Sequence, residues 1–342
     1  MKLGWHIGYW GRAMPQGIPQ TLAEVERLGF DSAWTAESWG SDAISPLAWW
    51  GAGTTTIRLG TNLIQISART PTATAMAAIT MDHLSGGRFC LGLGVSGPQV
   101  VEGWYGQPFN RPLARTREYV SIVRKILARE DRLTNDGPEY PIPALDGLGL
   151  GKPLNVMTHP LRADLPIFIG AEGPKNVALA AEVADGWFPI FYAPRHENLY
   201  GPSLAEGFAR PGARRTPDNF EILPTVNVAI DDDVDAAYDR LRPTLALYVG
   251  GMGAKEMNFH ADVFRRLGHE AAVERIQTLF ADGKQNEAIG AVPNQMIDEV
   301  CLVGPKAKVA DDLAAWRDSR VTTMLVGGSI ATLRTMAELV LG

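Results

Sequence analysis

The sequence predicts an α/β fold, a closed TIM barrel of parallel strands and surrounding helices with insertions. Short apolar runs alternate with helical patterns along the chain, as in parallel strands joined by crossover helices. About eight such runs can be distinguished, the number that closes this barrel. The chain has 342 residues, of which 46% are hydrophobic, and this suits one barrel with a large core. The pattern alone is also compatible with an open, doubly wound sheet.

The clearest βαβ unit spans residues 59–97. Its first strand places small and polar residues between apolar ones, as expected for a buried strand. Thr70 offers an N-cap hydroxyl, and Pro71 occupies the first helical position, where a missing N–H costs nothing. A Ser-Gly-Gly turn ends the helix, and a second strand follows at residues 88–95. Two strands joined by one such crossover helix run parallel.

The remaining elements follow the same rhythm. Further strands are expected at residues 3–9, 30–35, 166–169, 187–191, 222–230 and 322–326. Helices are expected at residues 20–28, 45–50, 112–128, 175–183, 234–247, 306–318 and 330–341. Apolar residues recur at helical spacing in most of these segments, which gives each helix one face to bury against the barrel.

Two segments interrupt this rhythm. Residues 129–164 are rich in Gly, Pro and Asp and show little periodicity, whereas residues 250–297 show helical patterns near 263–267 and 271–280. The first is interpreted as an insertion because the strand–helix pattern resumes after it, and the second is too short and too interrupted to build a core of its own. We therefore expect one domain over residues 1–342, with an irregular insertion and a helical one.

Charge and composition restrict the partners and the compartment. A formal net charge of −6 argues against a nucleic-acid or anionic membrane surface, and no apolar run approaches the roughly 18 residues of a membrane span. Cys90 and Cys301 lie in apolar runs and are expected to be buried free thiols, consistent with a reducing cytoplasm. No signal peptide is visible at the start of the chain. The six histidines show no metal-ligand spacing, so no metal site is predicted.

Small residues end the strand at 88–95. Gly92, Gly94 and Gly97 match the dinucleotide fingerprint G-x-G-x-x-G, which also requires an acidic residue ending the next strand. Glu118 has that spacing but lies in a predicted helix. The barrel interpretation is preferred, because small residues at a strand end allow a flat ring to lie against the backbone.

A glycine-rich turn follows the strand at 166–169 and opens a helix. It consists of Gly170, Ala171, Glu172, Gly173, Pro174 and Lys175. Free N–H groups and the positive end of a helix dipole bind anions, most often phosphate. The alternative is an ordinary strand-to-helix turn with Pro174 at the first helical position.

Glu37 and Ser38 follow the strand at 30–35. They therefore lie on the face of a barrel where catalytic groups are placed. Glu37 is a candidate catalytic carboxylate, and Ser38 a candidate hydroxyl partner. An equally good interpretation is that Glu37 caps a helix or forms an ion pair.

These motifs together resemble the luciferase-like family. The resemblance rests on Ala36-Glu37-Ser38, the run from Leu59 to Gly94, Arg115-Thr116-Arg117-Glu118-Tyr119, the turn at 170–175 and Ala184-Asp185-Gly186-Trp187. The family comprises TIM-barrel flavin monooxygenases and dehydrogenases that use the deazaflavin coenzyme F420. Its members often carry histidine after the acidic residue of the first motif, where this chain has Ser38.

The resemblance implies an oxidoreductase that transfers hydride between F420 and a small organic substrate, in a homodimer. It places the ring in the barrel mouth and the phosphate at the turn 170–175. The implied ring contacts are Asn62, Leu63, Ile64, Gln65, Val95, Ser96, Gly97 and Ile190, with a cis peptide between Asn62 and Leu63. The run from Gln65 to Thr72 is closer to the F420 branch than to the FMN branch. An FMN-dependent monooxygenase and a non-catalytic flavin-binding barrel remain the alternatives.

Overall fold

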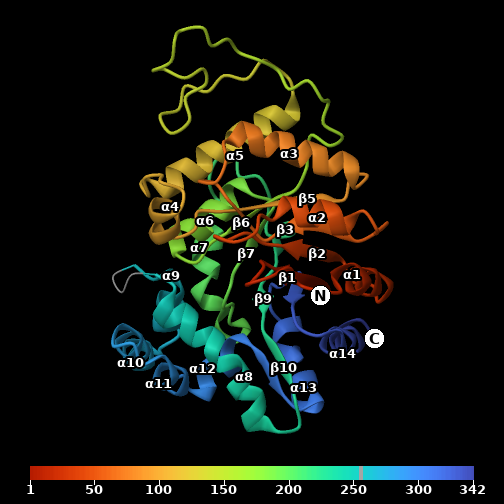
Figure 1. Ribbon diagram of the computed structural model, residues 1–342, viewed down its shortest axis with the longest axis vertical. Helices are drawn as coiled ribbons and strands as arrows, with labels where there is room; N and C mark the ends of the chain where they lie inside the picture. Colours follow the sequence, from red (N-terminus) through yellow and green to blue (C-terminus); the bar gives the residue numbers. More distant parts are fainter. Residues whose placement is uncertain (254–256) are drawn as a thin grey trace.

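The computed structural model describes residues 1–253 and 257–342. Its main sheet has ten parallel strands in the order β8-β7-β6-β5-β3-β2-β1-β12-β9, with β4 beside β5 (Figure 1). These strands are β1 (Lys2–Gly8), β2 (Ser32–Thr35), β3 (Arg58–Thr61), β4 (Ile64–Gln65), β5 (Phe89–Gly94), β6 (Ile167–Gly170), β7 (Gly186–Phe188), β8 (Glu221–Ile222), β9 (Thr225–Val226) and β12 (Thr323–Val326). Because β8 and β9 come from one short segment, the sheet curls round and closes through that segment. The predicted barrel is confirmed.

The helices lie outside this sheet, most of them around it and some in a group to one side (Figure 1). They are α1 (Ile18–Arg27), α2 (Ile44–Gly51), α3 (Pro71–Leu84), α4 (Pro98–Gly103), α5 (Pro112–Ala128), α6 (Pro174–Val183), η1 (Pro194–Leu199), α7 (Gly201–Phe208), α8 (Val234–Ala246), η2 (Leu247–Gly251), α9 (Phe259–Arg266), α10 (Glu270–Ala281), α11 (Gln285–Gly290), α12 (Asn294–Val300), α13 (Lys306–Arg317) and α14 (Ile330–Leu341). The predicted bounds of α5 and α14 are confirmed. Thr70 caps α3 by accepting a hydrogen bond from the Ala73 N–H at 3.2 Å.

The predicted strand at 222–230 is wrong in part. It is divided into β8, β9 and β10 (Val228–Ile230). Pro224 lies between β8 and β9, and it has no N–H for a sheet ladder, although its carbonyl accepts from Leu325 N at 2.9 Å. β10 leaves the barrel and pairs with β11 (Leu302–Gly304), a strand that the sequence analysis missed.

Aromatic side chains fill the barrel interior below the mouth. The Trp34 ring lies edge-on to Phe168 and Phe188, with centroid distances of 5.6 and 5.1 Å. Gly60 makes room for this cluster, because a Cβ there would lie 2.1 Å from the Trp34 ring. The interior is therefore a packed core, and the groups available for chemistry lie at the carboxyl ends of the strands.

The two predicted insertions differ in structure. Residues 129–164 contain no helix or long strand, only an isolated bridge between Asn135 and Ile142, and they project beyond α3 and α5 (Figure 1). The segment at 250–297 contains α9 to α12 and contributes to a second hydrophobic cluster with α8 and η2. Residues 254–256 of that predicted insertion lie outside the described residues.

Candidate active site

The wall of the barrel mouth begins where the third strand is interrupted. β3 and β4 both pair with β5, and Gly60 and Ile64 lie opposite Cys90 and Leu93. Four steps along one strand therefore match three along the other, and the extra residue forms a bulge. The Asn62–Leu63 peptide bond within this bulge is cis, which confirms the prediction drawn from the family resemblance.

Leu63 lies against two glycines of the neighbouring strands. A Cβ placed on Gly94 would be 2.5 Å from Leu63 Cδ1, and a Cβ on Gly170 would be 2.4 Å from Leu63 Cδ2. Both distances are far below ordinary van der Waals contact. The leucine thus occupies the space that side chains on β5 and β6 would need, and it packs across the ends of both strands.

Glu37 is engaged by its neighbours. Its carboxylate Oε1 accepts hydrogen bonds from Gln65 N and Arg69 Nη1, both at 2.8 Å, and only 3% of its side chain is exposed. Its own N–H donates to the Leu63 carbonyl at 3.2 Å. These contacts favour the ion-pair interpretation, in which Glu37 fixes β4 relative to the end of β2. Ser38 is the next residue outward and is partly exposed.

The Gln65 side chain leaves a buried acceptor without a donor. Gln65 is 3% exposed, and its Oε1 has no hydrogen-bond partner in residues 1–253 and 257–342. A buried carbonyl oxygen that stays unpaired costs about 1–3 kcal/mol. A ligand with an N–H or O–H at its edge fits this position, and the deazaflavin and flavin rings both carry such groups.

The turn at 170–175 lies at the end of β6, next to Leu63. Gly173 is the N-cap of α6, with φ −80° and ψ 149°, and a Cβ there would meet nothing within 4 Å. Pro174 and Lys175 are exposed. The backbone N–H groups of Gly173 and Lys175 donate to no acceptor within the part of the chain that the structure describes. An open helix N-terminus of this kind fits a phosphate group.

Glu172 occupies the same turn with its side chain turned back into the protein. Its Oε1 accepts from Ile190 N at 3.0 Å, and its carbonyl accepts from Arg266 Nη2 at 2.9 Å. Burial raises the pKa of Glu172 from 4.5 to about 8, since an enclosed carboxyl disfavours its charged form. The carboxyl is therefore largely protonated at neutral pH and adds little negative charge beside a phosphate.

His6 lies at the end of β1 and hydrogen-bonds to the Asn62 backbone. Burial lowers its pKa from 6.5 to about 4, so the imidazole is uncharged at neutral pH. The sequence analysis gave His6 no role. Its position on the first strand indicated that it could face the barrel mouth. No feature of the sequence indicated the contacts of Arg69 and Arg266.

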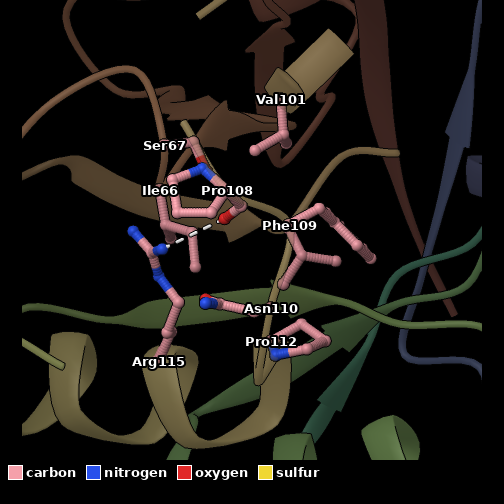
Figure 2. Close-up of a pocket in the computed structure, with 9 residues that line it drawn as sticks. Ile66, Ser67, Val101, Pro108, Phe109, Asn110, Pro112 and Arg115 are labelled. Carbon is pink, nitrogen blue, oxygen red and sulfur yellow. Dashed lines mark hydrogen bonds between the residues drawn. The ribbon is translucent and has the colours of Figure 1, made fainter. Parts of the chain in front are cut away.

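A small pocket lies at the edge of the surface formed by β4 and β5 (Figure 2). Its lining residues are Ile66, Ser67, Val95, Val101, Pro108, Phe109, Asn110, Pro112 and Arg115. The cavity has a volume of about 10 Å³, room for about one water molecule. Arg115 Nη1 donates to the Pro108 carbonyl at 3.3 Å and so holds the loop over the pocket. Predicted site residue Val95 lines the pocket, and Ser96 and Gly97 follow it, Ser96 with φ 61°.

The predicted cofactor residues on β4, β5 and β6 thus lie on neighbouring strand ends, and Ile190 joins them through Glu172. Residues 5–323 match the family described as Luciferase-like monooxygenase. The chain belongs to this family. The resemblance inferred from the sequence is therefore confirmed.

Relatives with similar sequences are described as F420-dependent or pterin-reducing proteins. A Mycobacterium tuberculosis protein with the provisional name coenzyme F420-dependent oxidoreductase is 57% identical, over 99% of both chains. The 5,10-methylenetetrahydromethanopterin reductase of Archaeoglobus fulgidus is 28% identical over 90% of this chain and 87% of its own. Because the first relative is so similar over its full length, the family assignment extends to the whole chain.

Solved structures share the fold. The F420-dependent tetrahydromethanopterin reductase of Methanopyrus kandleri superposes with a TM-score of 0.82, covering 99% of this chain and 98% of its own, at 22% identity. An F420-dependent secondary alcohol dehydrogenase has a TM-score of 0.78 at 17% identity, with coverage of 99% and 98%. At these identities the likeness establishes the barrel alone.

The rest of the molecule offers no competing centre among the residues described. No group of three or more His, Cys, Asp or Glu side chains in residues 1–253 and 257–342 could hold a metal ion. None of the described helices is both long and apolar enough to span a membrane. Cys90 and Cys301 are buried and free, as predicted.

Proposed function

We propose that this chain is an oxidoreductase that transfers hydride between the deazaflavin coenzyme F420 and a small organic substrate. The single observation that carries the proposal is the packing of Leu63 across Gly94 and Gly170, which brings one apolar side chain and the ends of three strands together as a backing for a flat ring. The 57% identical relative named for F420 supports the deazaflavin. The coenzyme would supply a carbon centre that gives or takes a hydride.

The chain's own residues would bind and orient this ring. Leu63 supports it from behind, with Asn62 and Ile64 beside it in the bulge. Gln65 Oε1 accepts a hydrogen bond from its edge and is held by the Glu37–Arg69 pair, since Glu37 also accepts from Gln65 N. Orientation and exclusion of water are the main contributions a protein makes to hydride transfer.

The phosphate would bind at the start of α6. The free N–H groups of Gly173 and Lys175 point to this position, and the Lys175 ammonium adds charge. Gly170, Ala171 and Pro174 complete the turn, and Val95, Ser96, Gly97 and Ile190 border the ring. We propose Ser38 as the hydroxyl that orients the substrate oxygen at the rim, with Glu37 positioning the strand behind it.

A second candidate is an FMN-dependent monooxygenase. A Baeyer–Villiger monooxygenase in complex with FMN shares the fold with a TM-score of 0.62 at 16% identity, and the same surface would accept a flavin ring. A non-catalytic flavin-binding barrel is the third candidate. The F420-dependent function is favoured because the 57% identical relative is named for F420.

An absorbance titration separates the three functions. A spectrum is recorded of the protein as purified and then during titration with F420 or FMN. We expect tight binding of F420, and reduction or oxidation of the bound F420 when a suitable substrate is added. Copurified FMN with oxygen consumption would instead establish the monooxygenase. Tight binding without turnover of any alcohol, aldehyde or pterin would establish the binding protein.

We also propose that the protein is a cytoplasmic homodimer. Two buried free thiols suit a reducing compartment. Three apolar side chains on α2 and α3 face solvent, namely Trp49, Met76 and Leu84, and exposed apolar surface of this kind marks contact with another protein.

A further inference from the structure

Four ring-bearing side chains pack together on one side of the barrel mouth. They are Phe191 after β7, Tyr9 after β1, Tyr248 on η2 and His260 on α9, called the aromatic wall from here on. The Tyr248 ring lies edge-on to Phe191 and to His260, with centroid distances of 5.4 and 4.9 Å. The Tyr9 hydroxyl lies beside that of Tyr248 and, after burial, adds to the rise in the pKa of Tyr248. Edge-on packing is a favourable arrangement of aromatic rings.

The aromatic wall lies across the mouth from Leu63. Tyr248 is beside Phe191, which follows β7, and beside Tyr9, which follows β1. In the closed sheet β8, β9 and β12 lie between these two strands, and β5 lies on the opposite side from β9 and β12. Leu63 packs across the ends of β5 and β6. A ring backed by Leu63 would therefore have the aromatic wall on its other side, where a substrate has to bind.

Both ends of α9 are fixed to the rest of the mouth. At its start, Asn258 Oδ1 accepts from His260 N at 3.1 Å, and Asn258 Nδ2 donates to the Val249 carbonyl at 2.8 Å. At its end, Arg266 Nη2 donates to the Glu172 carbonyl in the turn before α6. His260 is therefore held in one position, which lowers the entropy cost of binding a ligand against it.

His260 leaves a buried nitrogen without a partner. Its Nδ1 is enclosed and forms no hydrogen bond with residues 1–253 or 257–342. Most buried polar atoms in proteins have a hydrogen-bond partner, so an unpaired one calls for an explanation. The Nδ1 atom donates in one tautomer of the neutral ring and accepts in the other. A hydroxyl group can pair with either tautomer, and a carbonyl oxygen with the first.

Three titratable groups of the mouth are uncharged at neutral pH. Burial lowers the pKa of His260 from 6.5 to about 4, as it does that of His6, and the buried Glu172 carboxyl is largely protonated. Asp, Glu, Lys and Arg are absent from the segments that contain Phe191 and Tyr248 and from the one after β12, namely residues 189–193, 246–253 and 327–329. A charged ligand would lose its hydration here without gaining an opposite charge.

We propose that the substrate is an uncharged alcohol or carbonyl compound with an aromatic or bulky apolar body, which packs against the aromatic wall while its oxygen pairs with His260 Nδ1. This inference rests on the proposed oxidoreductase and names its substrate class. Small-molecule sites combine an apolar, aromatic lining with a few placed polar groups, as the aromatic wall does. A substrate oxygen has two lone pairs, which allows the hydrogen bond proposed for Ser38 as well.

Calorimetric titration of the F420-saturated protein with two ketones tests the substrate class. Acetophenone is uncharged, whereas para-acetylbenzoate has the same ketone and ring and adds a carboxylate. The coenzyme and both ketones are in the oxidised form, so binding is measured without turnover. We expect acetophenone to bind at least about tenfold more tightly, because the carboxylate finds no counter-charge at the wall. Equal affinities, tighter binding of the anion, or no binding of acetophenone would overturn the proposal.

His260→Phe tests the hydrogen bond, because it keeps a ring and removes both nitrogens. The affinity for acetophenone should fall about three- to tenfold, and that for ethylbenzene, which has no oxygen, should not change. The matched control His159→Phe, at an exposed histidine of the insertion at 129–164, should bind both compounds like the wild type. Unchanged affinity for acetophenone in the folded His260→Phe variant, or an equal loss for both compounds, would contradict the role of His260.

Tyr9→Arg tests the absence of counter-charge in the opposite sense. Tyr9 is 44% exposed, so the change is tolerated by the fold, and the new guanidinium should raise the affinity for para-acetylbenzoate several-fold. An unchanged affinity would show that the ketone does not bind against the aromatic wall. An F420 titration of the same preparations keeps the two proposals separate. F420 binding with a preference for the anionic ketone contradicts only the substrate class, whereas a protein that binds no F420 contradicts the proposed function.

Discussion

Two glycine positions in the mouth look alike in the sequence but differ physically. Gly94 ends β5, and a Cβ there would lie 2.5 Å from the Leu63 side chain. Gly173 begins α6, and a Cβ there would meet nothing within 4 Å. Both lie in glycine-rich segments that the sequence analysis assigned to cofactor binding. The first glycine is required by packing within the protein, whereas the second leaves space that the protein does not use.

This difference separates two kinds of cofactor contact. In the proposed complex, the glycines of β5 and β6 would act on the ring indirectly, through the leucine that fills the space beside them. The glycine of the α6 turn would act directly, because open space and free N–H groups are what a phosphate needs. Substitution of the first kind should therefore damage the fold, and substitution of the second kind should damage binding alone.

The largest effect is expected from Gly92→Ala in β5. Its Cβ would lie 1.9 Å from the Thr61 carbonyl oxygen, which belongs to the backbone of a paired strand and cannot move aside cheaply. We expect a loss of about 3 kcal/mol or more in the free energy of unfolding, measured by urea denaturation. The matched control Gly173→Ala should lose less than about 0.5 kcal/mol, and equal losses would contradict the comparison.

Gly173→Phe should weaken coenzyme binding and leave the stability of the fold unchanged. A large side chain at the N-cap of α6 blocks the phosphate position without meeting protein atoms, so F420 affinity should fall more than about tenfold, or about 1.4 kcal/mol. The melting temperature without coenzyme should stay within about 2 °C of the wild type. F420 affinity is measured by fluorescence titration. If the folded variant binds F420 as tightly as the wild type, the phosphate does not bind at this turn.

Glu37→Gln tests whether the ion pair between Glu37 and Arg69 holds Gln65 in position for the coenzyme. The substitution leaves the Arg69 guanidinium without its charged partner, and the side chain of Arg69 is 23% exposed, so water compensates in part. We expect a loss of about 1–2 kcal/mol in stability and several-fold weaker coenzyme binding. Asp42→Asn, a change to a carboxyl whose oxygen caps α2 through Ile44 and Ser45, should leave coenzyme binding unaltered. If both variants bind the coenzyme with the same affinity, Glu37 does not position Gln65 for binding.

The smallest expected effect concerns pH. The pKa of Glu172 in the folded protein, about 8, lies above its ordinary value of 4.5. Its contribution to stability is therefore complete below about pH 4.5 and is lost as pH rises towards about 8. Glu172→Gln should remove this pH dependence, so its stability relative to the wild type should rise between pH 5 and pH 8.5, measured by urea denaturation at each pH. The control Glu206→Gln, at an exposed carboxyl, should show no such gain.

Much of the fold could be predicted because its signals are local. The helix at 112–128 and the cap at Thr70 follow from periodicity and capping chemistry within a few residues. The strand at 222–230 failed because Pro224 divides it, and a short apolar run cannot show which sheet it joins. β11 was missed for the same reason, since three residues are too few for a pattern.

The site was predicted less completely because its contacts join distant residues. Arg69 reaches Glu37 across 32 positions, and Arg266 reaches Glu172 across 94, separations for which a single sequence gives no signal. The Asn62–Leu63 cis peptide was predicted only through the family resemblance. The exposure of the apolar side chains in the insertion at 129–164 was also not predictable, because irregular segments usually run over the protein surface.

A crystal structure of the protein with bound F420 tests the central claim most directly. The account predicts the ring in van der Waals contact with Leu63 beside Gly94, with Gln65 Oε1 accepting from the ring edge. It also predicts the phosphate within hydrogen-bond distance of the Gly173 and Lys175 N–H groups. A ring bound away from Leu63, or a phosphate that contacts neither N–H group, would contradict it.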